Sequence, residues 1–427
     1  MVQAIRGMRD VLPDEGRRWR AVEQSLESVL LSYAYEEVHL PLMEFTELFS
    51  RGVGEATDIV EKEMYSLLDR DGDSLTLRPE GTAGCVRVLQ QHGLLFNQTQ
   101  RVFYRGPMFR YERPQKGRYR QFYQMGAVAF GSAGPDVDAE LLAMTAAFWK
   151  TLGIEDKVRL EINTLGSSES RARYRAALVD YLSGFEAELD EDSRRRLATN
   201  PLRILDTKVE RTRNLLEGAP VLSQFMDEEG LAHFDGLKAT LDSLGIEYLV
   251  NPQLVRGLDY YNLTVFEWIT DDLGAQGTVC GGGRYDGLVE QLGGKPTPGA
   301  GFALGLERVL LLFEQRNQPT RPAADVYIAF MSQGEQVYAL QLAERLRQSV
   351  PELRIRVHAG GGKLKNQLKK ADQCGASWAA IVGADEVTAG TITLKTLATG
   401  EQITLGLDEA AERLTGLGGT GVRLSDR

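Results

Sequence analysis

Hydrophobic residues recur every three or four positions near the start of the chain. Over residues 17–34 they are Trp19, Val22, Leu26, Val29, Leu30 and Tyr33. This spacing predicts an amphipathic helix. The run EEVHLP, which ends at Pro41, predicts a strand. We therefore expect the fold to open with a helix followed by a strand.

Short runs rich in β-branched and aromatic residues dominate residues 74–130. SLTLRP, RVFYRGPMFRYE and RQFYQMGAVAFG predict strands, with one helix around 81–92. Later runs, TVFEWIT and QGTVCGGGRYDGLV, predict further strands, and GAGFALGLERVLLLFE predicts a strand leading into a helix. Strands without regular helical crossovers are typical of an antiparallel sheet. We predict an α+β domain over residues 1–314.

Two segments interrupt or end this pattern. Residues 166–245 are charged, helical in period and poor in β-branched residues, which predicts a helical insertion. Residues 315–324 are polar with two prolines and predict a linker. Strands and helices alternate over residues 325–427, which indicates a separate α/β domain of a size that commonly folds alone.

Composition bounds the class of protein. The chain has 427 residues, of which 43% are hydrophobic and 26% charged, as in ordinary globular proteins. The charged N-terminus and the lack of an 18-residue apolar run exclude a recognisable secretory signal or membrane span. Three widely separated cysteines fit a reducing compartment and lack zinc-ligand spacing. We expect a cytoplasmic protein that does not interact with a membrane.

Local charge departs strongly from the average. The formal net charge is -11, yet residues 101–123 carry seven basic side chains and one acid, Glu112. Arginines make bidentate phosphate contacts, and the interleaved aromatic residues can stack on bases. The segment therefore indicates binding of a nucleotide or nucleic acid. The alternative is a solvated hairpin whose arginines pair with acids elsewhere.

Glycine clusters occur at GGGRYDGL (281–288) and GAGFALGLER (299–308). Neither contains GxGxxG between a strand and a helix, so a dinucleotide-binding fold is excluded. Close packing of small residues in adjacent strands explains most of these glycines. Arg308, just inside the predicted helix, is well placed to stack on a flat ring.

These segments together resemble a known family. The opening IRGMRDVLP, the helix and strand ending at Pro41 (motif 1), residues 101–124 (motif 2), LVRGLDYYN (254–262), GGGRYDGL and GLER (motif 3) occur in the order found in histidyl-tRNA synthetases, which are class II aminoacyl-tRNA synthetases. The resemblance implies a class II catalytic domain, followed by an anticodon-binding domain over 325–427. In that domain GGGKLKNQLKK offers four cations for tRNA, namely Lys363, Lys365, Lys369 and Lys370. Considered alone, the run is more typical of a solvated helix face.

The resemblance also implies an activity and its residues. The enzyme would join histidine to its tRNA through an adenylate, using ATP and Mg²⁺, with the Mg²⁺ held mainly by the ATP phosphates. Arg110 and Arg256 would be catalytic, because two fixed cations stabilise charge on the reacting phosphate. The ATP-binding residues would be Arg110, Glu112, Arg118, Phe122 and Arg308.

The implied amino-acid pocket draws on three segments. Its members would be Glu80, Gly81, Thr82, Arg110, Gln124, Val128, Arg256, Tyr260, Tyr261 and Tyr285. Glu80 and Gln124 offer the oxygens that an α-ammonium group needs; for Glu80 the alternative is an ion pair with Arg78. Arg113 and Gln115 in the motif 2 turn would face the acceptor end of the tRNA. The motif 1 helix and strand would form a homodimer.

One position departs from the family. Between the anchors QxG (124–126) and FG (130–131) the family has a glutamate that accepts a hydrogen bond from the imidazole, and this chain has Val128. An unpaired, desolvated imidazole nitrogen costs about 1–3 kcal/mol. The departure bears on the substrate and leaves the implied fold and chemistry unchanged.

Three hypotheses follow. The first is a histidine–tRNA ligase, and the second is a synthetase paralogue whose pocket takes another amino acid or a modified histidine. The third is a non-catalytic regulatory subunit of the kind that assists the first enzyme of histidine biosynthesis. Such subunits lose the catalytic arginines and the anticodon domain. This chain keeps Arg110, Arg256, Arg308 and residues 325–427, which disfavours the third.

Overall fold

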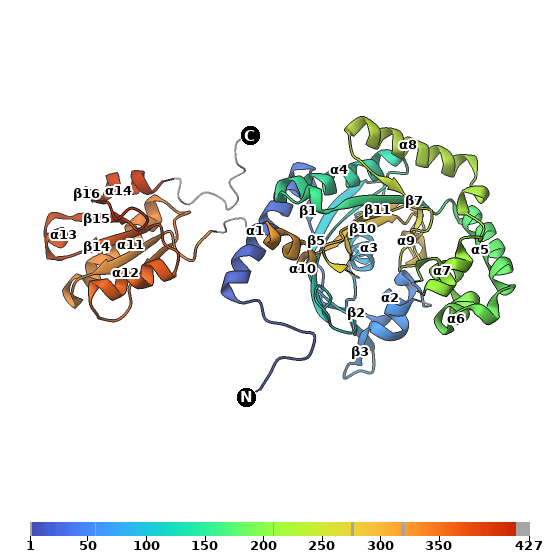
Figure 1. Cartoon of the computed structure of the whole chain (residues 1–427), viewed down its shortest axis with the longest axis horizontal. Helices are drawn as coiled ribbons and strands as arrows, with labels where there is room; N and C mark the ends of the chain where they lie inside the picture. The colour runs from blue at the N-terminus through green and yellow to red at the C-terminus, as the bar shows by residue number, and fades with distance from the viewer. Residues whose placement is uncertain (1, 56, 208, 275–276, 317–320, 416–427) are drawn as a thin grey trace. The chain divides into compact units, whose positions relative to one another are not determined.

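Two compact units make up the chain, each with its own sheet (Figure 1). The computed structural model describes residues 2–55, 57–207, 209–274, 277–316 and 321–415. The first unit comprises Met1–Asp10 and Val22–Asn317, and the second comprises Val11–Ala21 and Gln318–Arg427. Within the described ranges, no helix is long and apolar enough to span a membrane.

An eight-stranded sheet forms the centre of the first unit, in the order β1-β5-β6-β11-β10-β9-β7-β8. All neighbouring strands are antiparallel except the outer pairs β1–β5 and β7–β8. The fold is therefore α+β, as the strand pattern predicts. The strands are β1 (Glu36–Glu37), β5 (Gln100–Phe109), β6 (Gln121–Phe130), β7 (Arg159–Thr164), β8 (Leu249–Val250), β9 (Asn262–Ile269), β10 (Thr278–Arg284) and β11 (Gly299–Gly305).

Helix α4 (Pro135–Leu152) packs on one face of this sheet, and α8 (Glu228–Leu244) packs on α4 (Figure 1). Phe148 of α4 contacts Phe302 of β11, with ring centroids 5.7 Å apart. Trp149 contacts Trp268 of β9 at 5.9 Å. These aromatic contacts bury that face. The opposite face carries the site and, beside it, a buried cluster formed with residues of the helix at 82–91.

Other helices of the first unit pack against the large sheet and against one another. They are α2 (Thr46–Val53), α3 (Thr82–Gln91), α9 (Leu288–Gln291) and α10 (Leu306–Gln315), with a π-helical turn at Ile59–Glu63. Helix α3 begins directly after Glu80 and Gly81, close to the predicted start at 81. Helix α10 follows β11 without a break, so the GAGFALGLER segment is a strand leading into a helix, as predicted.

The start of the chain differs from the sequence-based expectation. Helix α1 spans Pro13–Ser32 and so begins four residues before the predicted start, because proline is favoured in the first helical turn and the acidic Asp14 and Glu15 suit that end. The expected strand EEVHLP contains only the two residues of β1. The SLTL run, β4 (Ser74–Leu77), pairs with β2 (Met43–Phe45) and β3 (Tyr65–Leu68) in a separate three-stranded sheet.

The segment 166–245 is helical, as its composition predicts. Helices α5 (Ser168–Ser183), α6 (Glu191–Thr199) and α7 (Glu210–Leu216) gather on one side of the first unit (Figure 1). Short 3-10 turns connect them, at Glu186–Glu188, Pro201–Asp206 and Leu222–Phe225. The last helix of the segment, α8, instead joins the layer over α4, where His233 contacts the buried Asp138 at 2.8 Å.

The second unit contains a five-stranded sheet in the order β13-β12-β14-β15-β16. Its elements are β12 (Val326–Phe330), α11 (Gln336–Ser349), β13 (Ile355–Val357), α12 (Leu364–Gln373), β14 (Trp378–Val382), α13 (Ala384–Ala389), β15 (Thr391–Thr396), β16 (Gln402–Gly406) and α14 (Leu407–Leu414). Strands and helices alternate along this unit as far as β15, as expected, and β15 and β16 follow one another as a hairpin. Parallel pairing of β12 with β13 and β14 follows from the helical crossovers between them.

The four lysines of GGGKLKNQLKK are exposed at and along α12. Lys363 is the N-cap residue, and Lys365, Lys369 and Lys370 follow on the helix. Gln367 anchors the opposite face, since its amide bonds both the N–H (3.1 Å) and the carbonyl (2.8 Å) of Phe330. The buried anchor directs the lysines to solvent, where an anionic partner can reach them.

If these lysines contact tRNA, as the resemblance implies, replacing each of them by glutamine in the full chain should weaken tRNA binding and flatten its salt dependence. Each lost phosphate contact should reduce the magnitude of the negative slope of log K against log[salt] by about 0.7–0.9. Binding titrations from 50 to 200 mM salt measure the slope. The control is Arg345→Gln, an exposed cation on α11 of the same unit. Equal slopes for the wild type and the four lysine variants would contradict a tRNA contact at α12.

Candidate active site

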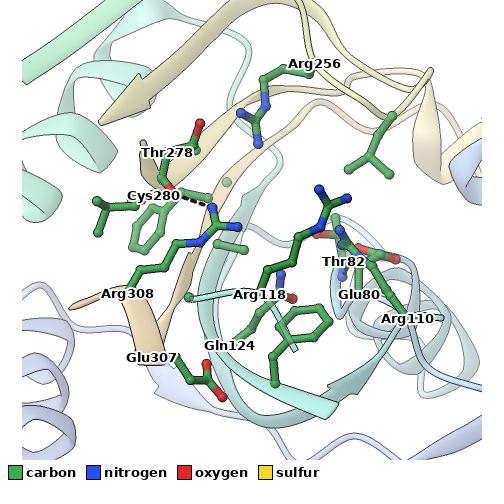
Figure 2. A pocket seen from close by; sticks show the side chains of 18 of the residues that line it. Glu80, Thr82, Arg110, Arg118, Gln124, Arg256, Thr278, Cys280, Glu307 and Arg308 are labelled. Atoms are coloured by element: carbon green, nitrogen blue, oxygen red, sulfur yellow. Dashed lines mark hydrogen bonds between the residues drawn. The ribbon is translucent and has the colours of Figure 1, made fainter. Parts of the chain in front are cut away.

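A cavity of about 180 Å³ opens on the face of the large sheet that α4 does not cover. Figure 2 shows arginine, carboxylate and amide side chains converging on it from several segments. Twelve of the residues expected from the sequence line it together, namely Glu80, Thr82, Arg110, Glu112, Arg118, Phe122, Gln124, Arg256, Tyr260, Tyr261, Tyr285 and Arg308. Segments more than 200 residues apart in the sequence thus form one site.

The strand register explains why glycines form the floor of the cavity. Gly301 lies opposite Val128, and Gly281 lies opposite Ala303, so these positions share one face of the sheet. A Cβ atom on Gly281 would lie 2.5 Å from Nη1 of Arg256, and one on Gly301 would lie 2.3 Å from the Tyr285 hydroxyl. The glycines leave room for side chains from other segments, which is the close packing expected from the sequence.

Arg110, just beyond the end of β5, is held by its surroundings. Its Nε donates to the carbonyl of Pro79 at 2.9 Å, and its guanidinium carbon lies 5.2 Å from the centre of the Phe122 ring. Burial lowers the pKa of Arg110, an effect opposed by the carboxylates of Glu63 and Glu80. The side chain is a fixed, poorly hydrated cation, which suits a preorganised electrostatic role.

Arg256 enters the cavity from the segment before β9 (Figure 2). It forms an ion pair with Glu267 of β9, and its side chain is 17% exposed. Its guanidinium carbon lies 5.9 Å from the Tyr261 ring. The floor at Gly281 brings this charge close to the sheet. Arg256 and Arg110 thus supply two cations to one cavity from different segments.

Two further arginines complete the basic lining. Arg308 donates from Nε to the carbonyl of Gly117 at 3.0 Å and also contacts the carbonyl of Thr278 (Figure 2). Burial, together with the charges of Arg118 and Arg110, lowers the pKa of Arg308 to about 10. Arg118 pairs with Glu112 on the same hairpin. This hairpin is the motif 2 segment, and its Arg110 and Arg118 line the cavity. Arg101 and Arg105 of the same segment instead pair with acids elsewhere, namely Glu140 and the pair Glu27 and Glu37, so the alternative interpretation of the segment holds for these two arginines.

A carboxylate and an amide mark another part of the cavity. Glu80 is 4% exposed and accepts the backbone N–H groups of Thr82 (2.6 Å) and Ala83 (3.0 Å) at the start of α3. Burial raises the pKa of Glu80, while these two hydrogen bonds and the charge of Arg110 oppose that shift. Arg78 instead donates to the carbonyls of Leu40 and Pro107, both at 2.9 Å. The alternative ion pair between Glu80 and Arg78 is therefore wrong.

Three tyrosines pack together at the deep end. The ring of Tyr260 lies 4.7 Å from that of Tyr261 and 5.3 Å from that of Tyr285. Burial holds the pKa of Tyr285 well above its ordinary value, so its hydroxyl stays protonated. Among the residues that the structure describes, this buried hydroxyl has no hydrogen-bond partner. A buried hydroxyl without a partner is costly and indicates a position that a ligand can satisfy.

Val128 lies beside these tyrosines on the floor strand β6. It is fully buried and does not line the cavity directly. A Cβ atom on Gly301 would lie 3.0 Å from Cγ1 of Val128 and 2.3 Å from the Tyr285 hydroxyl, so both groups border the same point. Its neighbours two residues away, Gly126 and Phe130, face Tyr104 and Tyr285 respectively. An apolar side chain thus occupies this position beside the tyrosines.

Comparison with known proteins agrees with this arrangement. Residues 7–309 match the histidyl-tRNA synthetase family, and residues 325–417 match an anticodon-binding domain. The chain belongs to the histidyl-tRNA synthetase family. The fold is accordingly that family's catalytic domain followed by an anticodon-binding domain.

Solved structures extend the comparison. The apo histidyl-tRNA synthetase of S. aureus shares 37% identity and a TM-score of 0.80, over 97% of this chain and 99% of that one. The histidyl-tRNA synthetase of Nostoc sp. PCC 7120 is similar in fold, at 22% identity and a TM-score of 0.71, over 96% and 98% of the two chains. A Bacillus halodurans protein described as an ATP phosphoribosyltransferase regulatory subunit/histidyl-tRNA synthetase shares the fold at 21% identity and a TM-score of 0.64, over 90% and 98%.

Some residues expected from the synthetase resemblance lie outside the cavity. Arg113 and Gln115 are exposed in the hairpin between β5 and β6. Gly81 lies under Tyr104, and a Cβ there would come within 2.2 Å of the ring. The structure brings neither group into the cavity lining. The lysines of α12 belong to the second unit.

Sequence reasoning missed the acids that accompany the arginines. Glu267 pairs with Arg256, and Glu63 lies 4.0 Å from Arg118. Glu307 accepts the N–H of Tyr123 at 3.0 Å, and burial raises the pKa of Glu307 to about 7. Glu307 could have been found from the sequence, because it directly precedes Arg308 in the GLER motif. Nothing in the local sequence links Glu63 or Glu267 to an arginine. The described residues contain no cluster of three or more potential metal ligands.

Arg110→Ala and Arg256→Ala should each lower the rate of histidine-dependent ATP–pyrophosphate exchange at least about 10²-fold. Each substitution removes a preorganised charge worth about 2.7–4 kcal/mol in comparable sites. The control is Arg101→Ala. Arg101 lies on β5, the strand that directly precedes Arg110, but it pairs with Glu140 outside the cavity. Wild-type exchange rates in either cavity variant would contradict the catalytic assignment.

Proposed function

We propose that this protein is a histidine–tRNA ligase, which joins histidine to its tRNA through a histidyl-adenylate. The observation that carries the proposal is one cavity that combines the buried carboxylate of Glu80 with fixed arginines from three segments. A carboxylate beside several cations suits a substrate pair in which an ammonium group must lie close to a polyphosphate. Family membership over residues 7–309 supports the same reaction.

The chemistry needs positioning and charge rather than a protein nucleophile. A carboxylate oxygen of histidine forms a bond to the α-phosphorus of ATP, while the bond to the bridging oxygen breaks and pyrophosphate leaves with the electron pair. Arg110 and Arg256 stabilise the charge that develops on the α-phosphate. A hydroxyl of the terminal ribose at the 3′ end of the tRNA then attacks the carbonyl carbon of the adenylate and loses its proton to solvent or to the phosphate. The bond from that carbon to the phosphate oxygen breaks, and AMP leaves with the electron pair.

The basic lining of the cavity would hold ATP. Phe122 and Arg308 would sandwich the adenine, with Arg118 at the terminal phosphate and Glu112 beside it. The stacking of Arg110 on Phe122 shows that this ring accepts a guanidinium on one face. Mg²⁺, when bound, neutralises charge on the ATP phosphates, which would supply most of its ligands.

The amino-acid part of the cavity would hold histidine by its two ends. Glu80 and the oxygen of Gln124 would accept hydrogen bonds from the α-ammonium group, with Gly81 and Thr82 beside them. That Gln124 oxygen is buried, and no described residue donates a hydrogen bond to it. The imidazole would lie among Tyr260, Tyr261 and Tyr285.

The tyrosine hydroxyls would replace the carboxylate that the family places at residue 128. A neutral hydroxyl both donates and accepts, so one hydroxyl satisfies either ring nitrogen. Val128 adds no charge, so the pocket favours the neutral imidazole over the imidazolium. The unpartnered hydroxyl of Tyr285 lies next to Val128 and is the nearest candidate.

We propose the following domain, partner and location assignments as well. Residues 1–314 would form the catalytic domain with the 166–245 insertion, 315–324 the linker and 325–427 the anticodon-binding domain. Arg113, Gln115 and the lysines of α12 would contact the histidine tRNA. A homodimer would form through α1 and β1, and β1 lies at an edge of the sheet. The protein would act in the cytoplasm.

ATP–pyrophosphate exchange with each of the twenty amino acids tests the substrate, and residue 128 tests its recognition. Wild-type exchange should be specific for histidine, and kcat/KM should fall as the pH drops below about 6.5, because the imidazole becomes charged. Val128→Glu should lower the KM for histidine and move that fall to lower pH, since a carboxylate favours the imidazolium.

Val128→Gln is the matched control, because it adds an acceptor without a charge and should leave the pH profile unchanged. Glu307, whose pKa is about 7, titrates in all three forms, so the difference between them reports residue 128. Wild-type exchange with another amino acid would instead favour a paralogue of shifted specificity. Identical kinetics in all three forms would show that residue 128 does not contact the substrate side chain.

A further inference from the structure

A second cavity adjoins the first and is rich in arginine. Its volume is about 300 Å³, and Arg256, Leu258 and Tyr261 line both cavities. The charged residues of its lining are Arg171, Arg175, Arg203, Arg256 and Asp259. Four arginines thus surround a cavity that has one carboxylate in its lining.

The walls of this second cavity come from two parts of the first unit. Arg171 and Arg175 lie one turn apart on α5, and Arg203 lies on the 3-10 turn Pro201–Asp206. Arg256 and Asp259 lie on the segment before β9. The helical insertion therefore faces the catalytic segment across a basic cavity.

The charges here are close enough to affect one another. Burial lowers the pKa of Arg171, and the like charge of Arg175 lowers it further, whereas Asp259 opposes the shift. Burial raises the pKa of Asp259 in spite of the opposing charges of Arg171, Arg203 and Arg175. Asp259 therefore interacts with three arginines, while Arg203 also lies 3.8 Å from Asp58 and Arg256 pairs with Glu267. Among the residues that the structure describes, Arg171 and Arg175 form no ion pair of their own, so an additional anion near these two side chains would be favoured.

The hydrogen bonds of Arg171 and Arg175 use only some of their N–H donors. Arg171 donates to the carbonyl of Tyr261, and Arg175 donates from Nη2 to the carbonyl of Thr199 at 3.3 Å. Each guanidinium has five N–H donors. Both arginines can hold the backbone with one nitrogen and present others to a phosphate, for which the planar guanidinium is well suited.

We propose that this second cavity binds a phosphate group that enters or leaves the catalytic cavity past Arg256. The inference rests on the proposed function, because that reaction supplies two such groups. One is the pyrophosphate released from ATP, and the other is a phosphodiester at the 3′ end of the tRNA. Arg256 contributes to both cavities and therefore provides a continuous cationic path between them.

Arg175→Gln, Arg203→Gln and the double variant test the proposal in the full chain. If pyrophosphate is the source, its KM in the exchange reaction should rise about tenfold for each charged hydrogen bond lost, with the KM for ATP unchanged. If the tRNA end is the source, the KM for tRNA in aminoacylation should rise by a similar factor while exchange is unaffected. Either rise supports the site.

Two controls isolate the cavity. Arg173→Gln removes an exposed arginine from the same helix, one that donates to the carbonyl of Phe225 and does not line the cavity, and it should change neither KM. Arg203→Lys retains the charge and should recover part of the loss. Unchanged KM values in the double variant, or equal changes in Arg173→Gln, would overturn the proposal.

Calorimetric titration with inorganic pyrophosphate separates this site from the proposed function. Absence of histidine-dependent exchange in the wild-type protein would refute the ligase assignment. The titration would still test the cavity, because it compares pyrophosphate binding by the wild-type and double-variant proteins directly. Weaker pyrophosphate binding in the double variant supports the cavity as a phosphate site. Equal binding in the two proteins, together with unchanged KM for tRNA, would refute it.

Discussion

The structure depends on concentrating positive charge in a buried cavity of an acidic protein. Arg110, Arg118, Arg256 and Arg308 line one cavity, while the chain carries a formal net charge of -11. Desolvation and mutual repulsion both oppose this arrangement, and the pKa of Arg308 falls to about 10 as a result. Local carboxylates offset the cost, and each is placed so that the guanidinium still faces the cavity.

Those carboxylates are Glu112 for Arg118 and Glu267 for Arg256, with Glu63 near Arg110 and Arg118. A polyphosphate can replace part of this compensation, because it offers negative charge at the same donors. The arginines are therefore fixed in position before a substrate binds. Fixed cations need no reorganisation during the reaction, which is the basis of electrostatic stabilisation.

The sheet leaves space for the cavity and for the side chains that line it. Gly126, Gly281 and Gly301 lie on the cavity face of three strands, and at each a Cβ would collide with Tyr104, Arg256 or the Tyr285 hydroxyl. The opposite face is filled by the aromatic contacts of α4. One face is thus a packed core and the other a floor for side chains from distant segments. Val128 lies on the same face of the sheet, and its apolar side chain is next to the tyrosines.

The arginine-rich cavity beside the helical insertion also concentrates positive charge. Asp259 compensates the arginines around it only in part, and Arg256 joins that cavity to the catalytic one. The insertion therefore adds charge next to the catalytic site in addition to covering its side.

The sequence by itself determined the α+β class, the helical insertion, the strand–helix unit at 299–315 and most of the residues that line the cavity. Periodicity reports local conformation, and long motifs in order carried the resemblance that named Arg110, Arg256 and Arg308. Only the tertiary structure decided that the SLTL run forms a separate small sheet, that Glu267 and Glu63 accompany the arginines, and that Arg78 does not pair with Glu80. These features depend on strand register and on contacts between segments far apart in the chain, which no local pattern encodes.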